Sequence, residues 1–394
     1  MRTPLLIVGG GIGGMSAAVA LAHAGFAVHV VEQASEFSEI GAGIQLAPNA
    51  MRVLDGLGLL PEIDRVSVQP SSLHFLNIDT ADRLATVDFS EPFIHRYGYP
   101  YTVLHRGDLL EVLLNACRAN DLITLEANKA MTEIVDRREF VEVEFADGTS
   151  YKCGAVVGAD GLWSKTRRHV SDDEPVCSAY VAYRGAVPIS ELPIPVDDDA
   201  EIIWIGPDRH LVQYPIRGGE LYNQVAVFRS RRYRPGMDNG DDWGTPDELD
   251  EHFGVACEQV RSSVSLFKRE RRWPMFDRNP IDNWTSGRIT LLGDAAHPML
   301  QYLAQGACQA IEDGACLAQY MLKNDGDARE AFASYQQDRL PRTAQIQRLA
   351  RAWGEIWHAR DAIIPALRDR VFARSSDEHY MDLDWLYQAK VLQP

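Results

Sequence analysis

Residues 5–32 constrain the fold of this chain more than any other stretch. They run from four apolar residues through a glycine cluster and a series of small residues to a second β-branched run that ends at Glu32. Gly9, Gly11 and Gly14 fit the pattern G-x-G-x-x-G, in which the glycines permit a sharp turn, close approach of a phosphate and tight helix–sheet packing. The stretch therefore predicts a strand, a dinucleotide-binding turn, a helix and a second strand.

The two ends of this unit predict how a dinucleotide binds. Phosphates would lie at the positive N-terminus of the helix. Glu32 ends the second strand, where a carboxylate can accept hydrogen bonds from ribose hydroxyls, which favours FAD or NAD over NADP. The alternatives are an ordinary glycine-rich turn or a secretory signal ending at Ala22-His23-Ala24. The strand that follows the helix argues against a signal.

Composition narrows the class of protein. The chain has 394 residues, of which 46% are hydrophobic and 24% charged, and this is typical of a soluble globular protein of two or three domains. The net charge of −17 would repel a phosphate backbone, so we expect no nucleic-acid partner. No apolar run is long enough for a transmembrane segment. The six cysteines form no C-x-x-C pair, which favours reduced thiols in a cytoplasmic enzyme, and we expect no metal site.

Two later segments place an aspartate after a buried strand. Asp160 lies in Gly158-Ala159-Asp160-Gly161, close to Ser164 and Arg167, and could contact a ribose or ribitol hydroxyl, although Asp-Gly usually marks a turn. Asp294 follows a strand at 289–292, and a loop with Pro298 then leads to a helix from about 306 to 323.

The segment after Glu32 offers two further candidates. Gly41 begins a Gly-Ala-Gly turn that could lie against the middle of a bound cofactor or form a plain surface turn. Asn49 is predicted to cap a helix that continues through Leu57. Arg106 stands at the start of another helix, where a cation opposes the helix dipole. A pyrophosphate would explain this arginine, and a solvated surface residue is the alternative.

The remaining segments favour an antiparallel sheet. Residues 70–100 and 173–272 alternate or run β-branched, and we interpret them as strands of one sheet. His210 and Tyr214 are four residues apart on one of these strands, so their side chains share a face. The alternative is a core histidine and tyrosine.

Together, these motifs in this order resemble the flavoprotein aromatic hydroxylases, which are single-component FAD monooxygenases. The resemblance covers almost the whole chain and is strongest in residues 96–109, 182–185, 210–220, 223–228, 291–307 and 384–386. It implies an α/β fold: a Rossmann-like FAD-binding domain (1–69, 100–172 and 273–325), an inserted, mostly antiparallel β-sheet substrate domain (70–99 and 173–272) and a C-terminal helical region (326–394).

The resemblance also implies residue roles. Glu32 would hold the adenosine ribose, Arg106 the pyrophosphate, and Asp294 the ribitol and pyrophosphate region. Asp160 belongs to a fingerprint associated with FAD and with pyridine nucleotide, and the backbone from Pro298 to Ala307 would face the isoalloxazine. His210, Tyr214 and Gln301 match active-site positions.

The implied activity is hydroxylation of 3-hydroxybenzoate, para to its hydroxyl, to 2,5-dihydroxybenzoate (gentisate) in aromatic catabolism. Bound FAD is reduced by NADH, with NADPH as the alternative, and then forms a C4a-hydroperoxide with O₂. We expect His210 to take the phenol proton, Tyr214 to hydrogen-bond the substrate, and Gln301 to position it. Arg184 and Arg217 are candidate carboxylate anchors, whereas His297 is expected to be structural.

Other readings of the sequence remain open. The ring could be that of salicylate or 6-hydroxynicotinate, because Met299 and Gln305 differ from what the resemblance predicts. A flavin-binding redox module that does not hydroxylate is a second class, and an NAD dehydrogenase is a third. The family expectation for assembly is a homodimer.

Overall fold

A mainly parallel sheet forms the base of the molecule in the computed structural model, which describes residues 4–38, 41–194, 196–237, 240–361, 363–373 and 380–389. In this described part the strand order is β18 (Thr285–Ser286), β19 (Ile289–Leu291), β12 (Ala155–Gly158), β1 (Leu5–Val8), β2 (Val28–Val31) and β8 (Ile123–Glu126). Strands β1, β2, β8, β12 and β19 pair in parallel, with β1 at the centre, and this confirms the predicted Rossmann-like unit.

Four helices pack on this sheet and on each other, and the first and third of them are rich in small residues. They are α1 (Ile12–His23), α5 (Arg106–Arg118), α8 (Gly306–Lys323) and α9 (Ala328–Trp357). A Cβ atom at Gly314 of α8 would lie 2.9 Å from the backbone of Ala17 in α1, so these two helices touch almost backbone to backbone. The contact explains why the sequence of α1 is dominated by alanine and glycine.

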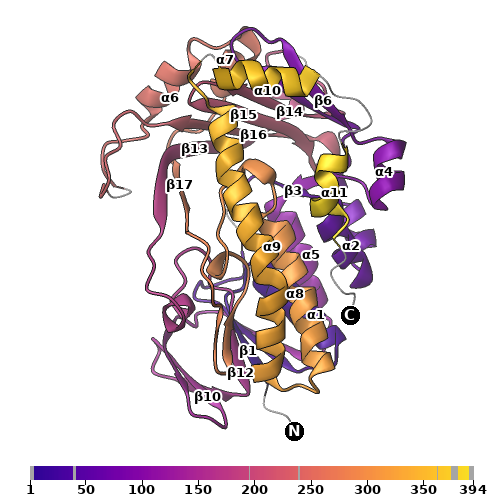
Figure 1. Cartoon of the computed structure of the whole chain (residues 1–394), viewed down its shortest axis with the longest axis vertical. Helices are drawn as coiled ribbons and strands as arrows, with labels where there is room; N and C mark the ends of the chain where they lie inside the picture. Colours follow the sequence, from indigo (N-terminus) through magenta and orange to yellow (C-terminus); the bar gives the residue numbers. More distant parts are fainter. Residues whose placement is uncertain are drawn as a thin grey trace.

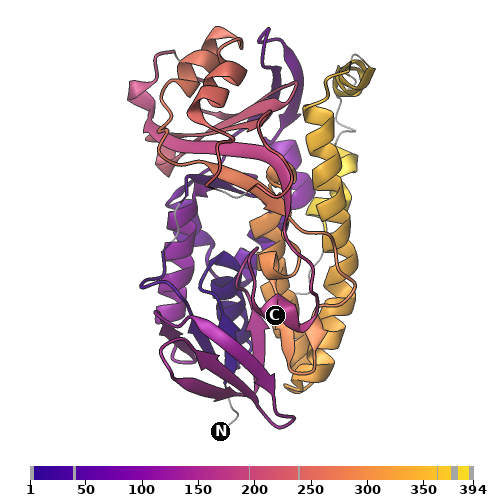
Figure 2. The same ribbon diagram turned by 90° about the vertical axis from the view of Figure 1, so that its left-hand side faces the viewer.

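A second, mostly antiparallel sheet lies above the base (Figures 1 and 2). Among the described residues its order is β17 (Trp273–Asp277), β13 (Val176–Pro188), β16 (Leu221–Arg229), β15 (Arg209–Ile216), β14 (Ala200–Gly206), β5 (Ser72–Asn77) and β6 (Arg83–Asp88). Only the β5–β14 pair is parallel. Residues 72–77 and 83–88 thus join this sheet, whereas residues 91–97, which were also expected to be strand, form a helix, and β17 extends the sheet beyond residue 272.

Two helices in this region were not expected from the sequence. Helices α6 (Pro246–Phe253) and α7 (Glu258–Val264) cover the outer face of the second sheet and bury Trp243, Phe253 and Val260 against it. The interpretation of 173–272 as strands alone was therefore wrong. A local signal was present, because Thr245 accepts a hydrogen bond from the amide of Glu248 at 3.4 Å, as an N-cap does.

Shorter elements complete the described fold. The strands β9 (Met131–Asp136), β10 (Val141–Phe145) and β11 (Ser150–Cys153) form one small sheet, and β3 (Gly43–Leu46), β4 (Ser67–Val68) and β7 (Thr102–His105) form another. The remaining helices are α2 (Pro48–Gly56), α3 (Leu60–Asp64), α4 (Glu91–Tyr97), α10 (Ile363–Ala373) and α11 (Met381–Tyr387). Part of the predicted C-terminal region, 374–379 and 390–394, lies outside the described residues.

The predicted cap of α2 is wrong. Helix α2 begins after Ala47, and Asn49 lies inside its first turn. The Asn49 side chain turns toward α8 instead, where its Nδ2 donates to Glu312 Oε1 at 2.5 Å and to Gln305 Oε1 at 3.0 Å. The polar residue at this position therefore serves a long-range contact.

Helix α9 connects the two parts of the molecule. It spans 30 residues, or about 45 Å, and runs from beside the lower sheet up to the second sheet (Figures 1 and 2). Its C-terminal residue, Trp357, is buried against that upper region. A single helix thus sets the relation between the FAD-binding and sheet domains.

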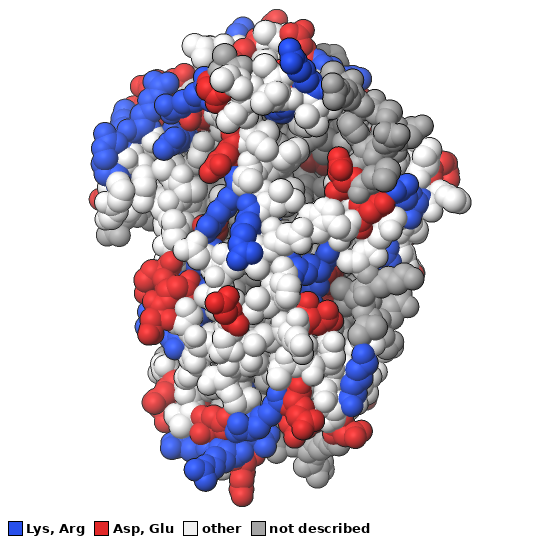
Figure 3. Space-filling model, viewed as in Figure 1, with Lys and Arg blue, Asp and Glu red and all other residues white. Residues whose placement is uncertain are grey.

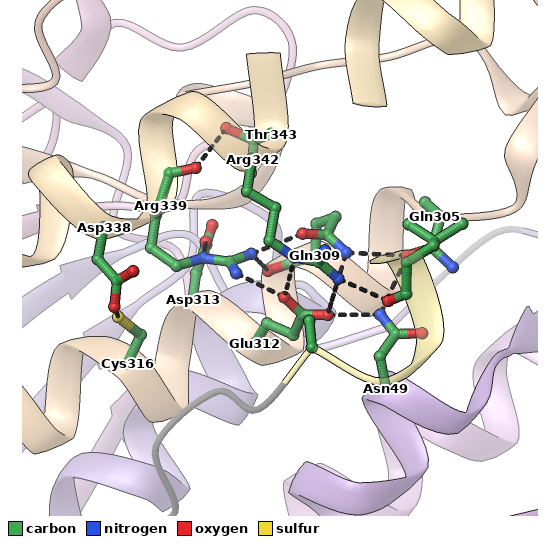
Figure 4. Close-up of polar contacts among 12 residues, drawn as sticks. Asn49, Gln305, Gln309, Glu312, Asp313, Cys316, Asp338, Arg339, Arg342 and Thr343 are labelled. Carbon is green, nitrogen blue, oxygen red and sulfur yellow. Dashed lines mark hydrogen bonds and ion pairs between the residues drawn. The ribbon is translucent and has the colours of Figure 1, made fainter. Parts of the chain in front are cut away.

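A buried ionic cluster fixes α9 on α8 (Figure 4). The Arg339 guanidinium of α9 pairs with Glu312 at 2.5 Å and with Asp313 at 2.7 Å, and all three side chains are almost completely buried. Burial alone would raise the pKa of Asp313, but His297 and Arg339 outweigh it and hold that pKa below its usual value. Arg342 adds a second cation, whose Nε lies 3.0 Å from Glu312 Oε2.

Acidic and basic side chains are interspersed on the face of the molecule that Figure 3 shows. Within the described part of the chain, no helix is long and apolar enough to cross a membrane.

The ionic cluster yields a stability prediction. Arg339→Met leaves two buried carboxylates without their main counter-charge, so we expect the free energy of unfolding in urea to fall by about 3–5 kcal/mol. Arg329→Met is the matched control, because it removes an exposed pair with Asp136 and should cost less than about 1 kcal/mol. Equal losses of unfolding free energy for the two variants would show that the buried ion pairs stabilise the fold no more than the exposed pair does.

Candidate active site

A cavity of about 430 Å³ lies where the two domains face each other. Its walls come from the glycine-rich loop, β3, the loop after β19, the start of α8 and the inner face of the second sheet. It contains groups from both ends of the predicted site, including Gly11, Asp294, His210 and Gln301. The structure thus brings together residues that lie almost 300 positions apart in the sequence.

The glycine-rich loop has the close contacts that its sequence predicts. Gly9 has a φ of +112°, and a Cβ there would lie 2.3 Å from the carbonyl oxygen of Ala159. A Cβ at Gly14 would lie 2.0 Å from the carbonyl oxygen of Gly9. Gly11 caps α1 and lines the cavity, so the free amides of the helix N-terminus face the space where phosphates would bind.

Two of the predicted ribose contacts have other partners in this structure. The Glu32 carboxylate accepts hydrogen bonds from the amides of Gly10 at 2.8 Å and Ala34 at 2.9 Å, and so shapes the glycine-rich loop. The Asp160 carboxylate accepts from Ser164 Oγ at 2.5 Å and from the amides of Lys165 and Thr166. Ala159 and Gly161 line the cavity beside it.

Arg106 and Asp294 line the cavity, whereas Gly41 lies against the side chain of Arg106. Arg106 is the first residue of α5, and a Cβ at Gly41 would lie 3.1 Å from its Cδ, so Gly41 makes room for the arginine. Asp294 is exposed although its neighbours are buried, because its side chain faces the cavity. Burial among those neighbours raises its pKa, against the opposing effects of His297 and Arg106.

The loop after Asp294 is held from behind. Gln347 of α9 donates to the carbonyl oxygen of Pro298 at 3.0 Å. The fully buried His297 contacts Asp313 at 2.6 Å, which fits the structural role expected for it. The loop then passes Gln301, reverses at Ala304 with a φ of +52°, and enters α8, where Ala307 lines the cavity.

The inner face of the second sheet forms the opposite wall. Val212 pairs with Ile203 on one side and with Val225 on the other, and Val225 pairs with Arg184. His210 and Tyr214 flank Val212 on β15 and point to the same face. The wall therefore offers an apolar strip between a histidine and a tyrosine.

His210 is completely buried and has a buried partner. Its Nδ1 lies 2.8 Å from Nε2 of His358, the residue that follows α9. Burial, and secondarily His358, lower the pKa of His210 well below its usual value, and burial lowers the pKa of His358 to about 3. Both rings are therefore neutral at pH 7.

Gln301 indicates where the proton of His210 lies. Arg184 donates from Nη2 to Gln301 Oε1 at 2.9 Å, so the amide nitrogen of Gln301 faces His210 Nε2, at 3.4 Å. Because an amide N–H can only donate, His210 Nε2 carries the lone pair and Nδ1 carries the proton, which is donated to His358. The basic nitrogen of His210 is thus the one on the cavity side.

Three residues at this site were missed or left unplaced by the sequence. Arg184 lines the cavity, whereas the other candidate anchor, Arg217, pairs with Asp108 at the surface. His358 and Glu201 were not predicted at all. Glu201 is completely buried at the cavity wall, and burial raises its pKa to about 8. A charged residue in the strand 200–206, which is otherwise apolar, was the available signal.

Comparisons with known proteins decide the family. Residues 2–350 match the family model described as an FAD binding domain. A 3-hydroxybenzoate 6-hydroxylase of Polaromonas naphthalenivorans (strain CJ2) is 38% identical over 388 residues, which cover 98% of this chain and 95% of that protein. The chain is an FAD-dependent aromatic hydroxylase. A 3-amino-4-hydroxybenzoate 2-monooxygenase of Streptomyces platensis, PtmB3, is 35% identical over 389 residues, covering 98% of the hydroxylase and 96% of PtmB3.

The fold of the hydroxylase is also found in a solved structure. Klebsiella pneumoniae HpxO, complexed with FAD and uric acid, superposes with a TM-score of 0.83 at 23% sequence identity, and the match covers 96% of the hydroxylase and 95% of that chain. The cavity of the hydroxylase fits FAD on its own geometry. Its lining includes the N-terminal residues of α1, the side chain of Asp294 and the loop that leads to Ala307.

The glycine-rich loop generates the second prediction. Gly14→Ala places a Cβ against the Gly9 carbonyl oxygen, so α1 must shift, and we expect the variant to purify without the visible absorbance of bound flavin. Gly240→Ala is the control, because a Cβ there meets open space, and it should remain yellow. Full flavin content in Gly14→Ala would contradict the predicted role of this turn.

Proposed function

We propose that this hydroxylase converts 3-hydroxybenzoate to 2,5-dihydroxybenzoate, using O₂ and NADH, with NADPH as the alternative reductant. The observation that carries the proposal is the position of His210, whose Nε2 lies 3.4 Å from the amide nitrogen of Gln301 and whose Nδ1 lies 2.8 Å from Nε2 of His358. The 3-hydroxybenzoate 6-hydroxylase from Polaromonas supports the choice of ring and position, since it matches along almost the whole chain.

The phenol of the substrate must lose its proton to become reactive. His210 Nε2 accepts this proton, and the resulting imidazolium keeps its Nδ1 hydrogen bond to His358. An anionic ring in the cavity stabilises the imidazolium and opposes the lowering of the His210 pKa by burial. Bound FAD, once reduced, supplies the activation of O₂.

The other cavity groups bind and orient the ring. Burial, and secondarily Glu201, raise the pKa of Tyr214, so its hydroxyl stays protonated and can donate to the substrate. Gln301 is held by Arg184 and reaches toward His210, so it positions the hydroxyl end of the ring. The buried guanidinium of Arg184 gives the cavity a positive charge that favours an anionic substrate.

The reaction predicts a defined product. With FAD, NADH and air, 3-hydroxybenzoate should give gentisate in step with the loss of NADH. Chromatography measures the product, and absorbance measures the NADH. Loss of NADH with only hydrogen peroxide would mean that the ring is wrong, and salicylate and 6-hydroxynicotinate are the next substrates to test. If no aromatic compound stimulates NADH oxidation or yields a product, the proposed hydroxylation is excluded.

His210 provides the sharper test. His210→Ala removes the base, so hydroxylation should slow by about 10²- to 10⁴-fold while reduction of the flavin by NADH continues. His95→Asn, at an exposed site on α4, should behave as wild type. Rapid-mixing measurements of the two half-reactions separate these effects. Coupled turnover at the wild-type rate in His210→Ala would disprove the base assignment.

A further inference from the structure

Glu201 is a buried carboxyl group that the proposed chemistry does not use. It lies on β14 at the wall of the cavity, with none of its side chain exposed to bulk solvent. Its Oε1 accepts a hydrogen bond from Gln45 Nε2 at 2.5 Å. Its Oε2 has no hydrogen-bond partner among the described residues. A buried polar atom without a partner is costly, so a ligand that supplies one would gain from it.

The orientation of this carboxyl group is fixed from behind. The hydroxyl of Tyr101 donates to Gln45 Oε1 at 3.0 Å, which turns the amide nitrogen of Gln45 toward Glu201. The series of hydrogen bonds from Tyr101 through Gln45 therefore ends on Oε1 of Glu201 and leaves Oε2 of Glu201 without a partner among the described residues.

The sheet register places Glu201 beside Tyr214. Ile202 pairs with Gln213, so the next pair along the same register brings Glu201 and Tyr214 together. The hydroxyl of Tyr214 makes no hydrogen bond within the described part of the chain. This end of the cavity thus presents two oxygen atoms that are not yet satisfied.

His210 marks the other end of the same wall. It lies four positions from Tyr214 along β15, or about 13 Å between their backbones, with Val212 midway between them. One aromatic ring can lie on this apolar strip with its hydroxyl toward His210 and a second substituent toward Tyr214 and Glu201. In 3-hydroxybenzoate that second substituent is a carboxylate.

Among the described residues, Arg184 lines the same cavity from β13, and four tyrosines interact electrostatically with Glu201. They are Tyr101, which lies just before β7, Tyr214 of β15, Tyr222 of β16 and Tyr387 of α11. Burial raises the pKa of all four tyrosines, so they stay neutral below about pH 9. Burial also raises the pKa of Glu201 to about 8, so this side chain is a neutral acid at pH 7.

We propose that Glu201 acts as a protonated carboxylic acid that donates a hydrogen bond from Oε2 to the substrate carboxylate, beside the hydroxyl of Tyr214. This inference rests on the proposed function and supplies the carboxylate contact that the function requires. Arg184 adds long-range attraction to the anionic substrate; its Nη2 stays on Gln301, and its Nε has no hydrogen-bond partner among the described residues.

The sign of the pH dependence follows from the protonation state. Below the pKa of Glu201 the acid is neutral and can donate, and above it a carboxylate would repel the anionic substrate. The Kd of 3-hydroxybenzoate should therefore be constant up to neutral pH and rise by about tenfold per pH unit above about pH 8. The neutral analogue 3-hydroxybenzamide should show no such rise.

The experiment measures binding to the FAD-loaded enzyme through the change in the flavin spectrum, between about pH 6 and pH 9.5. Glu201→Gln keeps an uncharged donor, so it should bind 3-hydroxybenzoate within about threefold of wild type at pH 7, with a flat pH profile. Glu201→Leu should lose about tenfold at pH 7. Tyr222→Phe is the matched control, because it removes a nearby buried hydroxyl that has no described hydrogen-bond partner and lies off the cavity wall, and it should keep the wild-type profile.

Each contrary result overturns a distinct statement. A flat wild-type profile, or a rise that persists in Glu201→Gln, disproves the role of Glu201 even if gentisate is formed. A Kd that falls with rising pH means that Glu201 binds as a carboxylate to a donor group on the ring, which also disproves it. If 3-hydroxybenzoate does not perturb the flavin at any pH, both this inference and the proposed function fail.

Discussion

The pairing of two buried carboxylates on α8 with one guanidinium from α9 is the interaction on which the site depends. Glu312 and Asp313 are consecutive residues, so they can face one cation only if α9 lies at a fixed position along α8. Asp313 also accepts a hydrogen bond from the Gly293 amide at 3.0 Å, which ties the cavity loop to the same cluster. Isolated charges at this depth would be strongly destabilising, so helix packing and loop position are set together.

The residues of the proposed catalytic site come from distant parts of the chain. His210 belongs to the sheet domain, Gln301 to a loop of the FAD-binding domain, and His358 to the end of α9. The bond from Arg184 to Gln301 crosses between the first two of these. The proposed base, its histidine partner and the glutamine proposed to orient the ring are therefore aligned only when the two domains are docked.

The sequence predicted the parts of the fold that depend on local pattern. The glycine pattern at Gly9 and Gly14 predicts a close backbone contact. The alternation of residues around His210 predicts which side chains of that strand share a face. Long-range partners carry no such signal. Asn49 has the residue type of a helix cap, yet it bonds across to α8, and His358 follows a helix without any motif around it. Glu201 stood out only as an acid in an apolar strand, and its neighbours Gln45 and Tyr101 are about 100 to 160 positions away. The short helices α6 and α7 were not predicted, because the segments on either side of them are rich in residues that favour strands.

The length of α9 has a consequence for how this sequence can change. Arg339 and His358 lie 19 residues apart, about 28 Å along one helix axis, and each is fixed to a partner outside that helix. Adding or removing a single residue between them would rotate the helix end by about 100° and shift it by about 1.5 Å, carrying His358 away from His210. The segment between these two positions should therefore tolerate substitutions but not the insertion or deletion of a residue.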